Sequence, residues 1–214
     1  MSSHHLRSAI AAASAFVAAA AATPARAQGF AVGIEGGYYD MTNARDSAKA
    51  IFDGTAGGPT FGVFARLGIG RSWFVGAGAR VFQKTGERAF AADKNSPAFR
   101  LGHPLEVRVL PVYALLGYRV SPDASLSPYL GVGAGMTSYR EESTVAGEVT
   151  TDTASKASFH GVLGLEYGQG KVRFALEGMY MTVPDIIGEA GISQVYEEDD
   201  VGGFSVVGRI VFVP

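Results

Sequence analysis

The last stretch of the chain, residues 203–213, alternates between two kinds of side chain. Every second position is apolar or glycine: Phe204, Val206, Gly208, Ile210 and Phe212. Successive side chains of a strand point to opposite faces, so the pattern predicts a β-strand that carries Arg209 on its second face. A soluble sheet buries its apolar face, whereas a membrane barrel turns that face to lipid and keeps polar groups in the lumen.

Seven further segments are predicted strands, and all of them except residues 104–120 share this alternation: residues 29–41, 57–69, 73–85, 104–120, 128–140, 157–168 and 171–183. They are long enough to cross a bilayer at a tilt. The connections between them alternate long and short along the whole chain, and we find no helical period. The faces of residues 104–120 stay ambiguous because Pro111 interrupts an almost continuous apolar run. Proline cannot donate to the ladder, so we expect a β-bulge there.

The N-terminus predicts export. Arg7 is followed by an alanine-rich run and by Ala25-Arg26-Ala27, a small-x-small cleavage site, so residues 1–27 form a predicted signal peptide. The predicted mature domain, residues 28–214, has no apolar run long enough for a transmembrane helix. Without Arg7 and Arg26 the 18 basic residues become 16, against 20 acidic ones, which disfavours nucleic-acid binding. The lack of cysteine excludes disulfides and thiolate catalysis.

Ionisable residues gather on the face opposite the apolar one. They are Glu35, Arg66, Arg80, His160, Glu166, Arg173, Glu177 and Arg209. The interior of an eight-stranded barrel is just wide enough for side chains to fill it, and unpaired buried charges are costly. The near balance of signs therefore predicts one internal ion-pair network in a closed lumen. We expect glycines on the same face to make room for the arginines: Gly62, Gly76, Gly78 and Gly133.

Aromatic side chains on the outward face fall near the strand ends. Trp73, Tyr167 and Phe212 lie beside short turns or the C-terminus, which predicts a girdle at the periplasmic rim. Tyr38 and Tyr180 fall nearer the outer rim.

We assign no catalytic, cofactor or metal residues. His160 with Glu166 and Glu177 could suggest acid–base chemistry, but we favour a structural histidine within the ion-pair network. The acidic residues 197–200 lack the spacing of a calcium loop. Basic residues of the second outer loop could contact lipid phosphates or only aid solubility: Lys84, Arg88, Lys94 and Arg100.

These features together resemble the small eight-stranded outer-membrane barrels of the OmpA/OmpX type, the outer membrane protein beta-barrel domains. The resemblance rests on the cleavage site, the strand count, the loop rhythm and a final strand, Ser205 to Phe212, that is similar to the signal read by the barrel assembly machinery. Members of that family usually end on the aromatic residue, whereas here Val213 and Pro214 follow it. The resemblance implies an outer-membrane location, contact with lipid and lipopolysaccharide, and a monomer without cofactor.

The sequence thus predicts an all-β protein, an eight-stranded antiparallel up-and-down transmembrane β-barrel. The expected function is structural, adhesive or surface-interacting, with a lumen closed by charged side chains and without enzymatic activity. Two alternatives stay open at this point. One is a narrow pore or a lipid-modifying barrel enzyme, and the other is a periplasmic ligand binder of lipocalin type.

Overall fold

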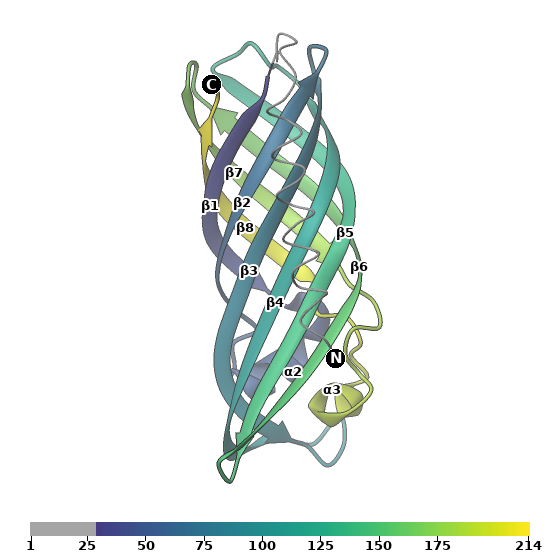
Figure 1. The fold of residues 1–214 in the computed structure, drawn as a ribbon. Helices are drawn as coiled ribbons and strands as arrows, with labels where there is room; N and C mark the ends of the chain where they lie inside the picture. The colour runs from purple at the N-terminus through teal and green to yellow at the C-terminus, as the bar shows by residue number, and fades with distance from the viewer. Residues whose placement is uncertain (1–28) are drawn as a thin grey trace.

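The computed structural model describes residues 29–214, in which eight strands close into one barrel (Figure 1). The strands are β1 (Ala31–Asp40), β2 (Gly57–Ile69), β3 (Trp73–Phe90), β4 (Phe99–Arg119), β5 (Leu126–Val145), β6 (Glu148–Tyr167), β7 (Val172–Thr182) and β8 (Gly203–Phe212). Every pairing is antiparallel, and β1 pairs with β8 from Val32 opposite Phe212 to Asp40 opposite Phe204. The predicted up-and-down barrel is confirmed, whereas the predicted signal peptide lies outside the described residues.

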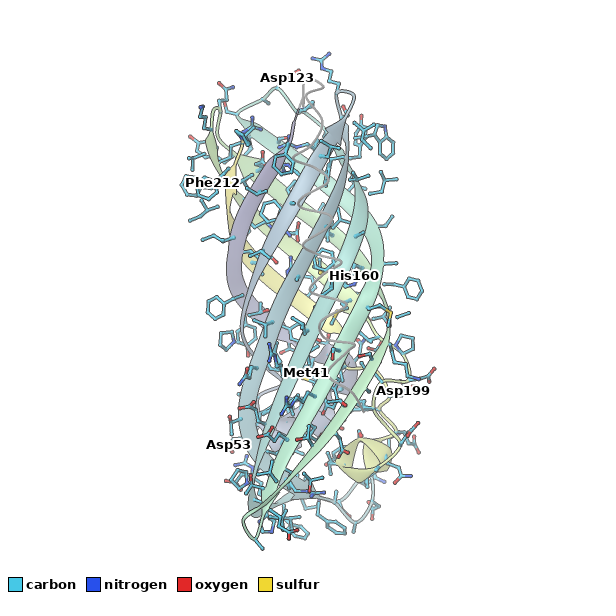
Figure 2. All side chains as sticks on the ribbon, viewed as in Figure 1. Met41, Asp53, Asp123, His160, Asp199 and Phe212 are labelled. Carbon is cyan, nitrogen blue, oxygen red and sulfur yellow. The ribbon has the colours of Figure 1, made fainter. Side chains whose placement is uncertain are left out.

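The strands alternate between a buried inner face and an exposed outer face, as β8 illustrates. Its arginine, Arg209, is 9% exposed, while Ile210 and Phe212 on the outer face are 37% and 44% exposed. The turns between β2 and β3, β4 and β5, and β6 and β7 lie at the same end as the C-terminus, so we expect this to be the periplasmic end of the barrel. Asp123 and Phe212 lie towards that end, and Asp53 and Asp199 towards the opposite one (Figure 2).

The structure settles the faces of β4, which the sequence left ambiguous. Its odd-numbered residues from Leu105 to Arg119 face inward, and Pro111 is among them. The predicted bulge at Pro111 is wrong, because Pro111 lies in register opposite Thr137 of β5. The register shift falls instead between Glu87 and Ala89, where β3 pairs with β4. A missing N–H removes one hydrogen bond but leaves the register of the neighbouring pairs intact.

Four strands are longer than predicted, because β3 to β6 continue through polar segments that we expected to be loops. The third outer connection is only a tight turn, with Ala146 and Gly147 at φ values of 52° and 86°. The alternation of long and short connections therefore fails there. Polar residues such as Glu141 and Asp152 pair across the strands without an apolar face that a sequence pattern would reveal. These extensions, together with the predicted strand residues next to them, form what we call the tall wall, residues 82–90, 99–109, 139–145 and 148–154.

In the part of the chain that the structure describes, three short helical segments occupy the outer connections, where the sequence shows no helical period. They are η1 (Thr42–Ala44), α2 (Arg45–Ile51) and α3 (Gly191–Tyr196). Each is too brief to show a helical period in the sequence. Among residues 29–214, no helix has the length and apolar character needed to cross a membrane.

An apolar core fills the space between the tall wall and these helices. Ala48 and Ile51 of α2 belong to the same buried cluster as Phe82 and Val109 of the wall and Val201 before β8. Asp200 ties the connections together, since it accepts hydrogen bonds from Asn43 Nδ2 at 2.9 Å and from the Val183 amide at 2.7 Å. The outer end of the barrel is therefore a folded unit, which we call the head: the tall wall, residues 41–56 and residues 183–202.

Candidate functional site

Four charged side chains from four strands meet at the middle of the lumen. Glu35 of β1, Arg80 of β3, Glu177 of β7 and Arg209 of β8 are each less than 10% exposed. Arg80 Nη2 lies 2.7 Å from Glu177 Oε1, and Arg209 Nε lies 2.6 Å from Glu35 Oε2. Arg80 also pairs with Glu35, and Arg209 with Glu177. This mid-lumen cluster is electrically neutral, and through Arg80 it links β3 across the lumen to β1 and β7, which are not its neighbours in the sheet.

Neutral side chains complete the hydrogen bonding of the mid-lumen cluster. The Tyr129 hydroxyl donates to Glu177 Oε2 at 3.0 Å, and Arg80 Nη1 donates to Ser205 Oγ at 2.8 Å. Arg209 Cζ lies 4.4 Å from the centre of the Phe64 ring. Buried ion pairs are tolerated only when such additional contacts satisfy the remaining groups.

A second set of charges lies nearer the periplasmic end and is not balanced. Glu166 of β6 accepts two hydrogen bonds from Arg66, at 2.5 and 3.0 Å, and one from Arg173 at 3.1 Å. Arg119 of β4 also donates to it. We call these four residues the mouth cluster. Arg119 was missed by the sequence analysis because it ends the strand whose faces were ambiguous.

His160 lies on the inner face but has no ion pair with any described residue, which corrects its predicted place in the network. Its Nε2 lies 3.0 Å from Ser158 Oγ, and its ring stacks 4.8 Å from that of Tyr113. Among the described residues, no group forms a hydrogen bond with its Nδ1. The charged residues thus form two clusters rather than one network, with His160 outside both.

Several inner-face glycines make room for aromatic rings rather than arginines. A Cβ on Gly164 would lie 2.1 Å from Cζ of Tyr129, its partner across the strands, and one on Gly117 would lie 2.2 Å from Cζ of Phe74. Gly78 is similarly placed against Tyr113. Of the four glycines predicted to accommodate arginines, only Gly62 faces one closely, with Arg80 Cγ 2.9 Å from its virtual Cβ. Gly76 and Gly133 lie against Leu115.

The predicted interface aromatics all lie on the outer surface. Their exposed fractions run from 44% to 62%: Tyr38, Trp73, Tyr167, Tyr180 and Phe212. Trp73 packs edge-on against Tyr118, its partner on β4, with 5.1 Å between the ring centres. The Tyr180 hydroxyl donates to Asn43 Oδ1 at 2.9 Å and so ties β7 to the first outer connection.

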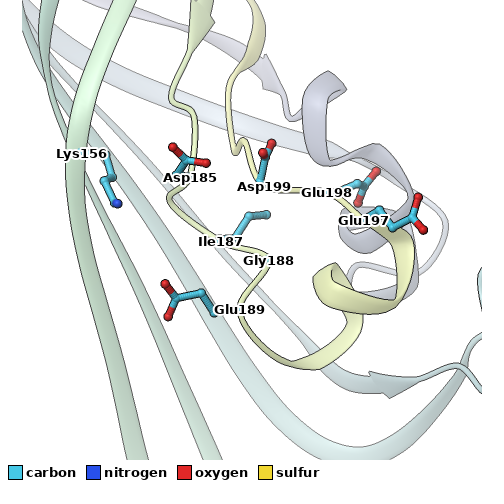
Figure 3. A pocket seen from close by; sticks show the side chains of 8 residues that line it. All are labelled: Lys156, Asp185, Ile187, Gly188, Glu189, Glu197, Glu198 and Asp199. Carbon is cyan, nitrogen blue, oxygen red and sulfur yellow. The ribbon is translucent and has the colours of Figure 1, made fainter.

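An acidic pocket of about 340 Å³ opens on the head (Figure 3). Two of its carboxylates already have partners. Glu198 accepts from the amides of Asp46 and Ser47 at 2.9 Å each, and Glu197 lies 2.7 Å from Lys94 Nζ. Within residues 29–214, no group of His, Cys, Asp or Glu side chains has the arrangement of a metal site.

An apolar outer wall around a charged interior defines a membrane-spanning barrel of the outer-membrane class. The chain belongs to the family described as outer membrane protein beta-barrel domain, which matches residues 8–206. It is therefore an outer-membrane barrel protein. No curated protein matches its sequence significantly.

Solved structures show the same fold at low sequence identity. Neisserial surface protein A (NspA) is 10% identical, with a TM-score of 0.56 over 86% of this chain and 95% of its own. A major outer membrane protein from Thermus thermophilus is 9% identical, with a TM-score of 0.50 over 86% of this chain and 99% of its own. At these identities the likeness concerns the fold alone.

Proposed function

We propose that the protein is a non-conducting barrel that anchors a surface-interaction head in the outer membrane. The observation that supports this most directly is that two separate layers of side chains fill the interior of the barrel. The mid-lumen cluster bridges β1, β3, β7 and β8 across the lumen, and the apolar core of the head fills the outer end. A water-filled channel needs an open polar path, whereas directly paired charged side chains fill the middle of this lumen and apolar side chains fill its outer end.

An exposed apolar tip supports the interaction role. Phe90 and Phe99 face each other at the end of the β3–β4 hairpin with 5.3 Å between ring centres, and they are 49% and 56% exposed. Leu101 beside them is 44% exposed. These residues lie at the head, away from the lipid-facing band, so lipid does not account for their exposure. Apolar patches of this kind mark protein contact sites.

Contact with lipopolysaccharide belongs to the same proposal. Arg108 of β4 lies directly opposite Arg140 of β5 on the outer face, just beyond Leu110 and Ser138, and Arg140 also pairs with Glu142. Like charges directly opposite each other destabilise a sheet, whereas a lipid phosphate between them would stabilise it.

The alternatives receive less support. A lipid-modifying enzyme would need an accessible nucleophile and base, but Ser158 and His160 are 0% and 4% exposed. Among the described residues, no acid forms a hydrogen bond with His160 Nδ1 to orient the ring as a triad does. The periplasmic lipocalin-like alternative is wrong, because the chain belongs to an outer-membrane family and its lumen is charged.

Two measurements test the proposed function. In planar bilayers the purified protein should give no stable conductance steps, and regular single-channel steps would establish the pore instead. Cells that display the protein should bind host or neighbouring cell surfaces, and Phe90→Ser with Phe99→Ser should reduce this binding. Val149→Ser, which alters an exposed apolar residue on the β5–β6 hairpin, is the matched control. Equal binding with and without the protein would refute the adhesive role.

A further inference from the structure

We infer that the mouth cluster binds a small phosphate-like oxyanion that enters from the periplasmic end. This site is independent of the proposed role of the head, since it lies at the opposite end of the barrel. The mouth cluster has three properties of an anion site: an excess of positive charge, two buried donors without a hydrogen-bond partner among residues 29–214, and access from the periplasm.

The mouth cluster carries more positive than negative charge. Three guanidinium groups, those of Arg66, Arg119 and Arg173, surround the single carboxylate of Glu166. The mid-lumen cluster, by contrast, matches two arginines with two glutamates. The mouth cluster therefore keeps two positive charges in excess. Unbalanced charges in a partly dry site are costly, and an anion would remove that cost.

Two buried polar atoms at the mouth cluster have no hydrogen-bond partner among the described residues. Arg119 Nε and Ser127 Oγ are buried, and among residues 29–214 neither has a hydrogen-bond partner. Ser127 is 3% exposed and lies directly opposite Glu166, on β5, between the strands that carry Arg119 and Glu166. Both atoms can donate, and an oxyanion oxygen would accept from both.

The cluster is accessible from the periplasm. The side chains of Arg119 and Arg173 are 13% and 21% exposed, whereas Glu166 is 1% exposed, so the cations lie on the solvent side of the carboxylate. The planar donor fork of arginine fits the oxygens of phosphate, and several basic residues at one mouth attract anions. This arrangement favours a free periplasmic anion over a lipid headgroup, because the inner face of the barrel does not contact lipid.

Thermal unfolding of the purified, folded barrel in dodecyl maltoside tests the site. Sodium phosphate should raise the Tm above its value in sodium chloride at equal pH and ionic strength, by about 5 °C or more at saturation. Arg119→Gln should abolish this increase, and Ser127→Ala should weaken it. Arg71→Gln is the matched control, because Arg71 is exposed at the same end and, within residues 29–214, pairs only with Asp123. Titration calorimetry with phosphate checks the same variants without reference to unfolding.

Repeating the phosphate titration in phospholipid nanodiscs distinguishes a free anion from the phosphate of a lipid headgroup. If the increase persists there, the ligand is a free anion; if it vanishes there but not in maltoside, a headgroup phosphate occupies the cluster. Equal Tm values in phosphate and chloride, together with no calorimetric binding, would overturn the inference. Loss of the effect in Arg71→Gln as well would also overturn it, because a general surface effect would then explain the data.

Discussion

Glu177 connects three side chains in the middle of the lumen. It accepts hydrogen bonds from Arg80, from Arg209 and from the Tyr129 hydroxyl, and it is 1% exposed. Because the two arginines lie in the dry interior, the carboxylate is what makes their burial tolerable. Glu177 therefore contributes to stability mainly because its loss would leave buried arginine charge without a compensating carboxylate.

We predict that Glu177→Gln lowers the free energy of unfolding by about 3–5 kcal/mol, because it leaves a buried positive charge uncompensated. Urea unfolding in detergent micelles, followed by tryptophan fluorescence, measures the change. Arg71→Gln is the control, since its exposed pair with Asp123 contributes about 0–1 kcal/mol. Equal losses in the two variants would contradict the role given to the mid-lumen cluster.

Gly164 also affects the mid-lumen cluster, because it makes room for the ring of Tyr129, whose hydroxyl donates to Glu177. Gly164→Ala would place a Cβ 2.1 Å from Cζ of Tyr129, so the ring must move and its hydrogen bond to Glu177 is weakened. We expect a loss of about 1–3 kcal/mol in the same unfolding assay. Gly161→Ala on the same strand meets no atom within 4 Å and should be nearly neutral. A neutral Gly164→Ala would show that the ring is not tightly held.

At the scale of elements, the outer connections are held together by exposed ion pairs. Lys94, between β3 and β4, pairs with Glu197 after α3, and Arg100 of β4 pairs with Asp53 after α2 at 2.5 Å. Exposed pairs contribute little energy individually. Their effect is to set which connections lie together over the apolar core of the head.

The Lys94–Glu197 pair should respond to pH. The hydrogen bond from Lys94 lowers the pKa of Glu197 below its ordinary value of 4.5, and the same bond raises the pKa of Lys94 above 10.5. The stabilising effect is therefore present between these two values. It is lost as pH falls through the lowered pKa or rises through the raised one.

Titration of the Glu197 carboxyl carbon by NMR checks this prediction. We expect its midpoint to lie below 4.5 in the unaltered protein and to move upward in Lys94→Gln. An identical midpoint in both proteins would mean that the pair does not form in solution.

The whole molecule combines two opposite ways of burying apolar surface. In the lipid-facing half, apolar side chains point outward and charges lie inside, whereas in the head Phe82, Val107 and Val109 point inward to an apolar core. The same strands, β3 and β4, serve both halves. The change occurs along each strand without a change of register near Pro111: the β4–β5 ladder runs on without a gap, and β3 pairs with β4 in the same register on both sides of Pro111.

We predict that the head can be weakened without opening the barrel. Phe82→Ala removes a ring that is 2% exposed and packs against Tyr39 and Phe52, so local stability should fall by about 3–5 kcal/mol. Limited proteolysis should then cleave residues 41–56 faster, while the heat-modifiable gel migration of the folded barrel persists. Phe61→Ala, on the lipid-facing side, should leave proteolysis unchanged. Loss of the folded gel band in Phe82→Ala would show that the halves unfold together.

The alternation of side chains was enough to predict the barrel, the strand order and the outward aromatics. It was not enough for the head, because polar extensions such as residues 141–145 and 148–156 lack an apolar face, and α2 is too short to show a period. It also misassigned His160, since a position on the inner face does not say which neighbour a side chain reaches.

The sequence by itself determined that apolar residues face lipid and charged residues face the lumen. This is because the position of a residue along a strand decides which face its side chain occupies. Only the tertiary structure decided that Arg80 meets Glu177, 97 residues away, and that three arginines converge on Glu166. Closure of the sheet and the stagger of its strands bring these residues to the same height, and both depend on all eight strands at once.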